Sequence, residues 1–530
     1  MNPFKTLFYI FLIFLFLGLL SFFFPKEGID LKVTVLHFPS FFEIFFTEAT
    51  ENSLNPKESP EEILNRMLLE TKKREFTAFA DSLAFYEKFF KEGGARFDLP
   101  DEDPTWFDKF FLNLEIASLG DTGIHILHYG DSQLEEDRIS STIREDLQTM
   151  FGGRGPGMIP AVASVPAMTY THTSSGALSR KIVFGDTSLL ALHNRYGVLG
   201  QVGELKGSAK ISFRKRKQRK NDFSRIEGFD VVRLIVGQES SDFKATLSYD
   251  AQVQVNDSTF KEERKIADAL TVEKKEKITI YKWTLEHPGI GATLSLQGKA
   301  EIYGIVADSS AGVSVDNIAM RGSSGTIFHK IDKSLLKESF EALNVKLLIL
   351  QYGGNMVPGM NASTEDWARK VVSRQIKILQ TIYPEADIVF IGPADMCKQI
   401  NGKMQSYPGL NRTIKVLKEI AKEYGIAYWD MHRVMGGDNS MISFVKQNPP
   451  LGASDYIHFT RAGAIHMGDL FSYSLKVYYD YFKFREAHKI DAKKLKEIKT
   501  FADSVQKNQD AFPLDSLSVK DTSGVSGESL

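Results

Sequence analysis

Residues 124–138, with the sequence IHILHYGDSQLEEDR, constrain the fold more than any other part of the chain. Residues 124–129 are a short apolar run with β character, Gly130-Asp131-Ser132 is a tight turn, and a helical pattern begins at Glu135. This order is typical of α/β proteins. It places one serine at the carboxyl edge of a parallel sheet, beside a helix amino terminus that favours a developing anion. Ser132 is therefore a candidate nucleophile, although such a turn can also serve only as a helix cap.

The alternation of strand and helix patterns resumes after residue 312. The predicted strands are residues 345–351, 387–391 and 426–429, and the predicted helices are 365–382, 412–424 and 462–484. Such alternation implies a parallel sheet with helices on both faces. Residues 174–311 interrupt it with short β-branched and aromatic runs, among them 277–283, 292–296 and 302–307, which predict an inserted β-sandwich module.

Six regions are expected along the 530 residues. They are a transmembrane anchor (1–26), a helical amino-terminal region (27–120), two parts of one α/β domain (121–173 and 312–488), the β module (174–311) and a charged, largely disordered tail (489–530). Within the second region, residues 31–37 are a possible strand and residues 60–93 have the pattern of a helical spacer. The end of the tail has too few apolar residues to form a core.

An uninterrupted apolar run covers residues 6–24, with Lys5 before it and Lys26 after it. Its length suits one helix across a bilayer. Because no small-x-small cleavage signal follows, we expect an uncleaved anchor with the rest of the chain outside the cytoplasm, in the periplasm or cell envelope. A cleaved signal peptide is the alternative.

Composition excludes several classes of function. The balance of 65 Lys+Arg against 67 Asp+Glu gives a net charge of -2, so no general attraction to nucleic acid is expected. One cysteine, Cys397, excludes an intramolecular disulfide framework and a multi-cysteine metal site, while a catalytic thiol stays open. The basic residues 214–220 are expected in a solvated hairpin loop, with contact to an anionic envelope polymer as the alternative. Glycine-rich residues 152–160 lack the Gly-Lys-Ser/Thr of a phosphate-binding loop.

Neither a metal nor a cofactor is expected. His125 and His128 lie in the first predicted strand and His466 in the last predicted helix. We expect all three to be structural or surface residues, with metal binding by two histidines as the alternative.

A serine nucleophile requires a histidine within hydrogen-bond reach and a carboxylate that orients this histidine. Asp455 and His458, in SDYIHFTRAG just before the last predicted helix, offer both. At a spacing of three in a turn, both side chains can project the same way. Asp455 then accepts a hydrogen bond from one ring nitrogen while the other faces Ser132. The alternative is a helix-capping Asp with an incidental His.

Catalysis of acyl transfer also needs donors fixed around the oxyanion. Asn355 follows the predicted strand 345–351, so its amide is expected at the same sheet edge as Ser132. Gly322, in the glycine-containing loop predicted at residues 317–325, can offer an unobstructed backbone N–H. The backbone N–H of Ser132 is expected to complete this oxyanion hole.

The order Gly-Asp-Ser, Gly, Gly-x-Asn, Asp-x-x-His resembles that of the SGNH hydrolases, also called GDSL esterases. This resemblance implies a flavodoxin-like sheet, with Ser132, Asp455 and His458 as the catalytic triad and Gly322 and Asn355 as oxyanion donors. The inserted module and the expected export resemble the peptidoglycan O-acetylesterase type. Two departures, Gln133 in place of Leu and Met356 in place of an Asp, concern the subfamily and the substrate. No Gly-x-Ser-x-Gly elbow surrounds the serine, which disfavours an ordinary α/β-hydrolase.

The resemblance therefore implies a metal-independent serine esterase that removes O-acetyl groups from an envelope glycan, with peptidoglycan as first choice. Its expected partners are this glycan and the membrane, and no nucleic acid. Three alternatives stay open: an esterase acting on another polysaccharide, an O-acetyltransferase, and a non-catalytic glycan-binding envelope protein.

The first prediction concerns topology. A reporter that is active only outside the cytoplasm, fused after Gly93, is expected to be active, because residues 6–24 are long enough to span and carry no charge. The same reporter on a chain without residues 1–26 serves as the control. A reporter that works only inside the cell would contradict the predicted compartment.

Overall fold

The structure is a computed structural model that describes residues 79–120, 122–216, 228–256 and 259–489, and two short strands near the amino terminus. The chain divides into two compact units, Met1–Asp81 and Ser82–Leu530. In the first unit, β1 (Ile29–Asp30) and β2 (Val35–Leu36) pair antiparallel. β2 lies within the strand predicted over residues 31–37, and the other residues of that prediction lie outside the described residues.

The predicted anchor (1–26), most of the predicted spacer and the tail beyond residue 489 lie outside the described residues. Among the residues that are described, no helix is long and apolar enough to cross a membrane. Residues 79–92 of the spacer are helical. The rings of Tyr86 and Phe90 lie 5.3 and 5.0 Å from that of Tyr481 in the last helix, α11 (Arg461–Ala487), so this part of the spacer is packed inside the second unit.

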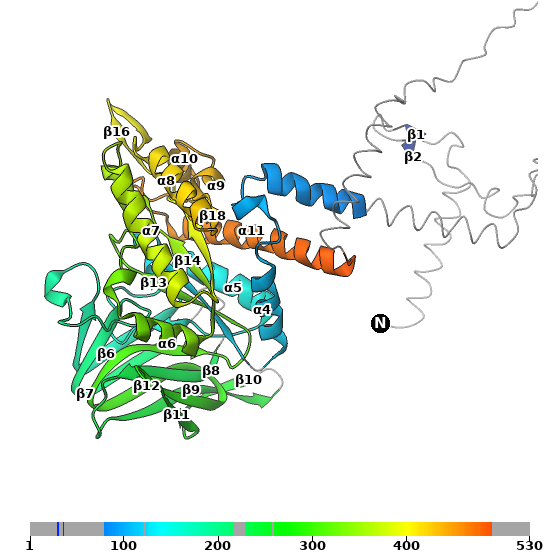
Figure 1. Ribbon diagram of the computed structural model, residues 1–530. Helices are drawn as coiled ribbons and strands as arrows, with labels where there is room; N and C mark the ends of the chain where they lie inside the picture. Colours follow the sequence, from blue (N-terminus) through cyan, green and yellow to red (C-terminus); the bar gives the residue numbers. More distant parts are fainter. Residues whose placement is uncertain are drawn as a thin grey trace, which may run out of the picture. The chain divides into compact units, whose positions relative to one another are not determined.

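The main sheet has six strands in the order β13-β4-β14-β15-β18-β3. Figure 1 labels β13, β14 and β18 of this sheet. They are β13 (Val313–Ala319), β4 (Ile124–Gly130), β14 (Val345–Gln351), β15 (Asp387–Ile391), β18 (Ala427–Trp429) and β3 (Phe97–Asp98). The first five are parallel, and β3 pairs antiparallel with β18. The predicted parallel α/β sheet is thereby confirmed, with β14 and β15 at their predicted bounds.

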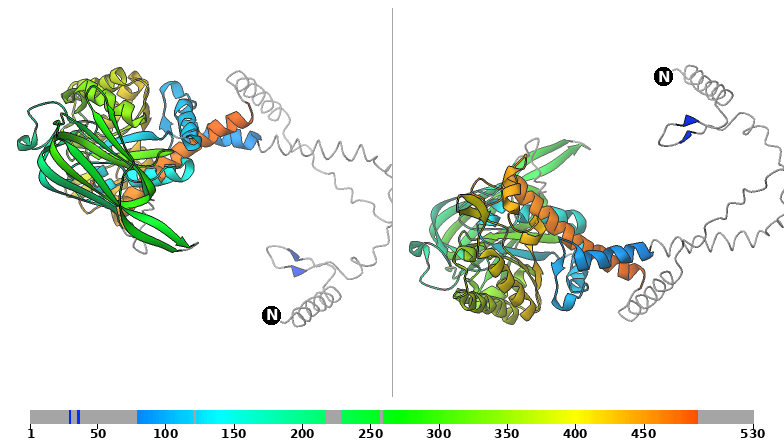
Figure 2. Two further views of the ribbon diagram at one scale, coloured as in Figure 1. Left: turned by 90° about the horizontal axis from the view of Figure 1, so that it is seen from below. Right: turned by 90° about the horizontal axis from the view of Figure 1, so that it is seen from above.

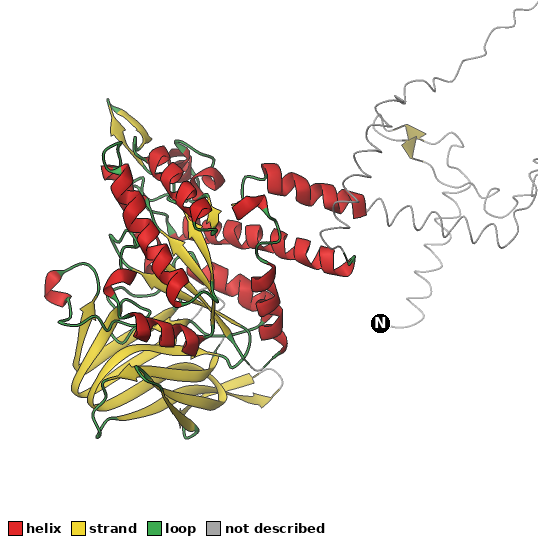
Figure 3. Cartoon of the chain, in the orientation of Figure 1, coloured by secondary structure: helices red, strands yellow, loops and turns green. Residues whose placement is uncertain are grey.

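Both faces of this sheet are buried under helices (Figure 3). On β4, Ile126 faces one core and its neighbour Leu127 faces the other. The core around Leu127 also contains side chains of α6 (Lys333–Leu343), α7 (Glu365–Ile382) and α8 (Leu410–Glu423), and that around Ile126 those of α4 (Asp108–Leu119), α5 (Ser140–Phe151), α9 (Met431–Met435), α10 (Ser440–Lys446) and α11. The strands are apolar almost throughout because a parallel sheet covered on both faces has no solvent side.

The inserted module lies between α5 and β13 and has eight antiparallel strands (Figure 2). They are β5 (Gly157–Ile159), β6 (Tyr170–Ile182), β7 (Gln201–Lys215), β8 (Phe229–Gly237), β9 (Lys244–Asn256), β10 (Thr259–Ile266), β11 (Leu270–Lys274) and β12 (Thr279–Asp308). These strands begin ahead of residue 174, where the module was expected to start.

The long strand β12 explains how the module closes on itself. Its middle part pairs with β7 and β9, while both of its end parts pair with β8. The three separate strands predicted within residues 277–307 are therefore parts of one bent strand. The predicted sandwich of two separate sheets is not confirmed, because hydrogen bonds link all eight strands into one sheet. Strands from different parts of this sheet contribute side chains to one core.

A buried charge network joins the module to the main sheet. His125 of β4 lies between two carboxylates, with Nδ1 2.6 Å from Asp316 of β13 and Nε2 3.1 Å from Asp308 of β12. Arg233 of β8 also donates to Asp308. Burial by itself lowers the pKa of His125, but the two carboxylates outweigh it and raise this pKa to about 9. His125 thus has the structural role that the sequence predicts.

A second buried ion pair holds the chain that follows β4. Both terminal nitrogens of Arg144 on α5 donate to Asp137, at 2.8 and 2.9 Å, and its Nε donates to the backbone oxygen of Val315. The side chains of Arg144 and Asp137 are only 1% and 3% exposed. Thr169, just before β6, donates to the same carboxylate, so this ion pair also connects the turn after β4 to the module.

Replacement of this carboxylate is expected to be strongly destabilising. Asp137→Ala leaves the guanidinium of Arg144 buried without a counter-charge, and we expect it to lower the free energy of unfolding by about 3–5 kcal/mol. The matched control is Asp480→Ala, which removes an exposed ion pair with Lys476 on α11 and is expected to cost under about 1 kcal/mol. Urea unfolding measures both. Similar small losses in the two variants would contradict the structural role of Asp137.

Candidate active site

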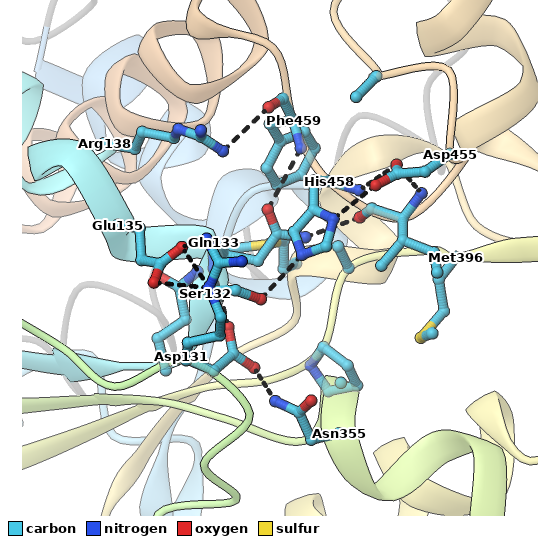
Figure 4. Close-up of a pocket in the computed structure, with 18 of the residues that line it drawn as sticks. Asp131, Ser132, Gln133, Glu135, Arg138, Asn355, Met396, Asp455, His458 and Phe459 are labelled. Atoms are coloured by element: carbon cyan, nitrogen blue, oxygen red, sulfur yellow. Dashed lines mark hydrogen bonds and ion pairs between the residues drawn. The ribbon is translucent and has the colours of Figure 1, made fainter. Parts of the chain in front are cut away.

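The predicted site residues meet at the carboxyl edge of the main sheet. Ser132 follows β4, Gly322 follows β13 and Asn355 follows β14, while Asp455 and His458 lie in the loop before α11. All five line one cleft of about 780 Å³. Figure 4 shows Ser132, Asn355, Asp455 and His458 in this cleft. Residues 317–319, which the sequence placed in a loop, are instead the end of β13.

The turn that presents Ser132 is built by its neighbours. Gly130 ends β4, and a Cβ at this position would lie 2.5 Å from a methyl carbon of Leu134, so a larger residue would require the buried Leu134 side chain to shift. The carboxylate of Asp131 accepts a hydrogen bond from the backbone N–H of Gln133 at 3.0 Å, as expected of a residue that caps the turn.

The helix predicted from Glu135 onward begins later than the sequence suggests. Residues Ser132–Asp137 form a 3-10 segment, η2, and α5 starts only at Ser140. Glu136, Asp137 and Ile139 have positive φ angles of 65°, 66° and 59°, which a continuous right-handed helix excludes. The predicted start at Glu135 is therefore wrong, although α5 itself is present.

Ser132, His458 and Asp455 form a continuous chain of hydrogen bonds. Ser132 Oγ lies 2.8 Å from His458 Nε2, and His458 Nδ1 lies 2.7 Å from Asp455 Oδ2. Since a carboxylate only accepts, Nδ1 carries the proton that is donated to Asp455. Nε2 is then free to accept the hydroxyl proton of Ser132, which is the arrangement that activates a serine nucleophile.

The loop that carries His458 is fixed by its own backbone. The second oxygen of Asp455 accepts hydrogen bonds from the N–H groups of Ile457 and His458 at 2.9 and 3.0 Å. Tyr456, between Asp455 and Ile457, adopts a positive φ of 60°. Burial by itself raises the pKa of Asp455, but the hydrogen bonds from His458 and Ile457 outweigh it and lower this pKa. Asp455 is thus ionised at neutral pH and suited to orient an imidazole.

Two backbone donors beside the nucleophile are unoccupied. Throughout the described part of the chain, the N–H groups of Ser132 and Gly322 have no acceptor. Gly322 lines the cleft and has a φ of 75°, a conformation that favours glycine. Unpaired N–H groups at the edge of a cleft are suited to stabilise an oxyanion.

The amide of Asn355 is already engaged. Its Nδ2 donates to Asp131 Oδ2 at 3.0 Å and to the backbone oxygen of Ser323 at 3.1 Å, which uses both of its hydrogens. Burial raises the pKa of Asp131 to about 6, despite the hydrogen bonds from Gln133 and Asn355 that lower it. The hydrogen bond between Asn355 and Asp131 connects the turn after β4 to the loop after β14.

The remaining candidate residues lie elsewhere. Cys397 is buried, and burial together with Asp395 raises the pKa of its thiol to about 12, which disfavours a reactive thiolate. His128 is buried between Gln351 and Ser140, and His466 lies against Phe444. No group of three or more His, Cys, Asp or Glu side chains with metal-binding geometry occurs among the residues described.

The basic cluster 214–220 lies only partly within the described residues. Arg214 belongs to β7 and donates to Asp250 on β9 and to Glu262 on β10, two strands that lie beyond β12 in the same sheet. Its guanidinium is therefore committed to the sheet, and the prediction of a solvated loop is wrong for Arg214.

Sequence reasoning missed an ion pair on the rim of the cleft. Arg321, next to Gly322, donates through Nε to both carboxylate oxygens of Glu135 at 2.9 and 3.0 Å. Glu135 is buried, whereas the side chain of Arg321 is 74% exposed. The two residues are 186 positions apart, and no local pattern distinguishes them from ordinary surface charges.

Comparison with known proteins identifies the fold. No family model matches the chain, and no curated protein matches it in sequence. A solved structure of a peptidoglycan O-acetylesterase matches 70% of this chain and 96% of its own length, at a TM-score of 0.55 and 16% identity. An acetyl xylan esterase and a carbohydrate acetylesterase from Sinorhizobium meliloti match 30% and 31% of this chain and 79% and 78% of their own, at 15% and 11% identity and TM-scores of 0.23. The first likeness shows that this chain has that fold, and so confirms the fold expected from the SGNH resemblance.

The buried carboxyl of Asp131 predicts a pH-dependent stability. Because the pKa of Asp131 is raised from 3.8 to about 6, the folded state favours the neutral carboxyl group. Asp131 therefore adds to the free energy of unfolding below pH 4, and this stabilisation is lost as the pH rises through 6. Relative to Asp131→Asn, the wild type is expected to lose about 2 kcal/mol of unfolding free energy between pH 4 and pH 7. Urea unfolding at several pH values measures this difference.

Asp186 offers a matched control. It caps the exposed 3-10 turn η3 (Thr187–Leu189) in the same manner, but hydrogen bonds from Ser188 lower its pKa. Relative to Asp186→Asn, the wild type is therefore expected to gain stability as the pH rises through the acid range. A difference between wild type and Asp131→Asn that does not change with pH would contradict the raised pKa of Asp131.

Proposed function

We propose that this chain is a serine esterase that removes O-acetyl groups from a glycan of the cell envelope, with peptidoglycan as the preferred substrate. The observation that carries the proposal is the unbroken hydrogen-bond chain from Ser132 Oγ through His458 to Asp455, inside a cleft. Such a chain has a specific chemical use, because it removes the hydroxyl proton of a serine as the oxygen attacks a carbonyl.

The first half of the reaction forms an acetyl-enzyme. Ser132 Oγ attacks the ester carbonyl carbon while His458 Nε2 takes its proton, and Asp455 stabilises the imidazolium that results. The negative charge on the carbonyl oxygen is stabilised by the free N–H groups of Ser132 and Gly322. His458 then returns the proton to the departing sugar oxygen, the ester bond breaks, and the sugar leaves with a free hydroxyl group.

The second half releases acetate. Water donates a proton to His458 Nε2 and attacks the acetyl carbon, and the same N–H groups stabilise the second oxyanion. The bond to Ser132 Oγ then breaks as Oγ recovers the proton. The enzyme returns to its starting state with the hydroxyl of Ser132 again bonded to His458.

Asn355 is the third oxyanion donor in this proposal. Its two amide hydrogens are shared with Asp131 and the backbone oxygen of Ser323 in the free protein. An oxyanion attracts a hydrogen more strongly than a neutral carbonyl oxygen does, so the hydrogen now given to Ser323 is the one that turns to the substrate. Asp131 keeps the other hydrogen and holds the amide in place.

Charged side chains in the cleft support a glycan as the substrate. Besides the triad, the cleft is lined by many apolar side chains, such as Met396, and by the charged side chains of Glu136, Arg138, Arg321 and Arg461. Hydroxyl groups of a sugar can form hydrogen bonds with such charged side chains, whereas a lipid chain offers them none. The shared fold with a peptidoglycan O-acetylesterase makes the acetyl esters of that polymer the first substrate to test.

An envelope location follows from the same proposal. We place the catalytic unit outside the cytoplasm, held by residues 1–26 as a membrane anchor, because O-acetylated peptidoglycan is found there. The support is the apolar run of residues 6–24 in the sequence.

The experiment that tests the proposal is acetate release from O-acetylated peptidoglycan by the full-length chain, with acetylated xylan as the competing polymer. Ser132→Ala and His458→Ala are each expected to lower kcat roughly ten-thousandfold, and the double variant scarcely further, because the two residues act as one unit. Ser118→Ala and His287→Ala, at positions outside the cleft, are the matched controls and should keep full activity.

Other outcomes distinguish the alternatives. Faster release from xylan would replace peptidoglycan as the substrate while keeping the esterase. Acetyl groups that move to an added sugar acceptor instead of to water would identify a transferase. A wild-type chain that releases no acetate and whose Ser132 is not labelled by a fluorophosphonate would contradict the enzyme proposal and leave a glycan-binding role.

A further inference from the structure

Gln133, the residue after the candidate nucleophile, bonds to the histidine loop on both sides of His458. Its Nε2 donates to the backbone oxygen of Ile457 at 2.7 Å, and its Oε1 accepts the backbone N–H of Phe459 at 3.2 Å. Figure 4 shows its side chain between Ser132 and the His458 loop. The side-chain amide therefore bonds to this loop as a neighbouring strand would, with one donor and one acceptor used together.

We propose that Gln133 is a positioning residue that sets the distance between Ser132 Oγ and His458 Nε2. Ser132 and Gln133 are adjacent in the chain, and Ile457 and Phe459 are adjacent to His458. The two amide hydrogen bonds thus close a short ring that contains both reacting side chains. This inference rests on the proposed function only in taking Ser132 and His458 as the reacting pair.

Few other contacts hold the two segments together. The loop itself is braced by Asp455, by a bond from Ala453 N–H to the His458 oxygen, and by a bond from Cys397 N–H to the Tyr456 oxygen. None of these groups belongs to the turn after β4. Arg138 reaches the Phe459 oxygen only at 3.5 Å. Gln133 therefore makes the shortest hydrogen bond between this turn and the backbone of the histidine loop.

The contact requires an amide or its equivalent. An ionised glutamate at this position would place a carboxylate oxygen, in place of the donor Nε2, next to the Ile457 oxygen, and these two acceptors repel each other. A protonated glutamic acid, by contrast, offers one O–H donor and one carbonyl acceptor with nearly the same spacing as glutamine. Methionine has a similar length and neither strong donor nor acceptor. Gln133→Glu and Gln133→Met therefore separate hydrogen bonding from side-chain volume.

The test compares kcat and KM of both variants with the wild type on a small acetyl ester from pH 5 to pH 8. Gln133→Met is expected to lower kcat about tenfold to a hundredfold at every pH, with little change in KM, because a misplaced base slows proton transfer without weakening substrate binding. Gln133→Glu is expected to show the same loss at pH 8 and to recover toward the wild-type value as the pH falls. Expressing each rate as a ratio to the wild type at the same pH removes the titration of the triad itself.

Gln380→Met is the matched control. Gln380 on α7 also donates its Nε2 to a backbone oxygen, that of Tyr424 at 2.9 Å, but it does not line the cleft. Its loss should leave kcat unchanged at all pH values. Circular dichroism of each variant verifies that the fold is retained.

Several results would overturn the inference. They are a wild-type kcat in folded Gln133→Met, a loss that appears only in KM, and a ratio for Gln133→Glu that does not change with pH. These failures differ from failure of the proposed function. In that case the wild-type chain itself would neither hydrolyse the ester nor be labelled at Ser132 by a fluorophosphonate, whatever residue stands at position 133.

Discussion

The turn after β4 holds the candidate site together through side chains that point to three different loops. Asp131 binds Asn355 after β14, Gln133 binds the backbone around His458, and Glu135 binds Arg321 beside Gly322. These contacts join the carboxyl ends of three neighbouring strands and the loop before α11. Because enzymatic rates fall steeply when reacting groups are misplaced, a single five-residue segment that contacts every part of the site is an economical way to align it.

Burial makes this alignment depend on electrostatics. Asp131 lies in a site where its charge is disfavoured, whereas Asp137, six residues on, is fully paired with Arg144. The paired carboxylate keeps the irregular η2 segment in place, although Glu136, Asp137 itself and Ile139 adopt positive φ angles. The stability of this segment therefore rests on the ion pair between Asp137 and Arg144, which lies outside the cleft.

The sequence predicted the parallel sheet because its strands are apolar on both faces, as in residues 345–351. It missed β13 because the polar residues Asp316 and Asn317 interrupt the apolar pattern. Asp316 is buried and Asn317 half-buried, and hydrogen bonds to His125 and Ser140, in other segments, satisfy their polar groups. The site residues were placed by their order along the chain. The contacts of Gln133 and Arg321 were not predictable in this way, since they join residues 324 and 186 positions apart without a local pattern.

The position of the module has a consequence for synthesis. β4 is buried along its whole length, and both of its neighbours, β13 and β14, follow the module in the chain. A growing chain thus exposes β4 as an unpaired apolar strand until the module has been made, and unpaired strands of this kind promote association between chains. Helices α4 and α5, encoded on either side of β4, can cover only the face that contains Ile126. The face that contains Leu127 stays uncovered until α6, α7 and α8 have been made. Newly made chains therefore need this face shielded from other chains before the sheet is complete.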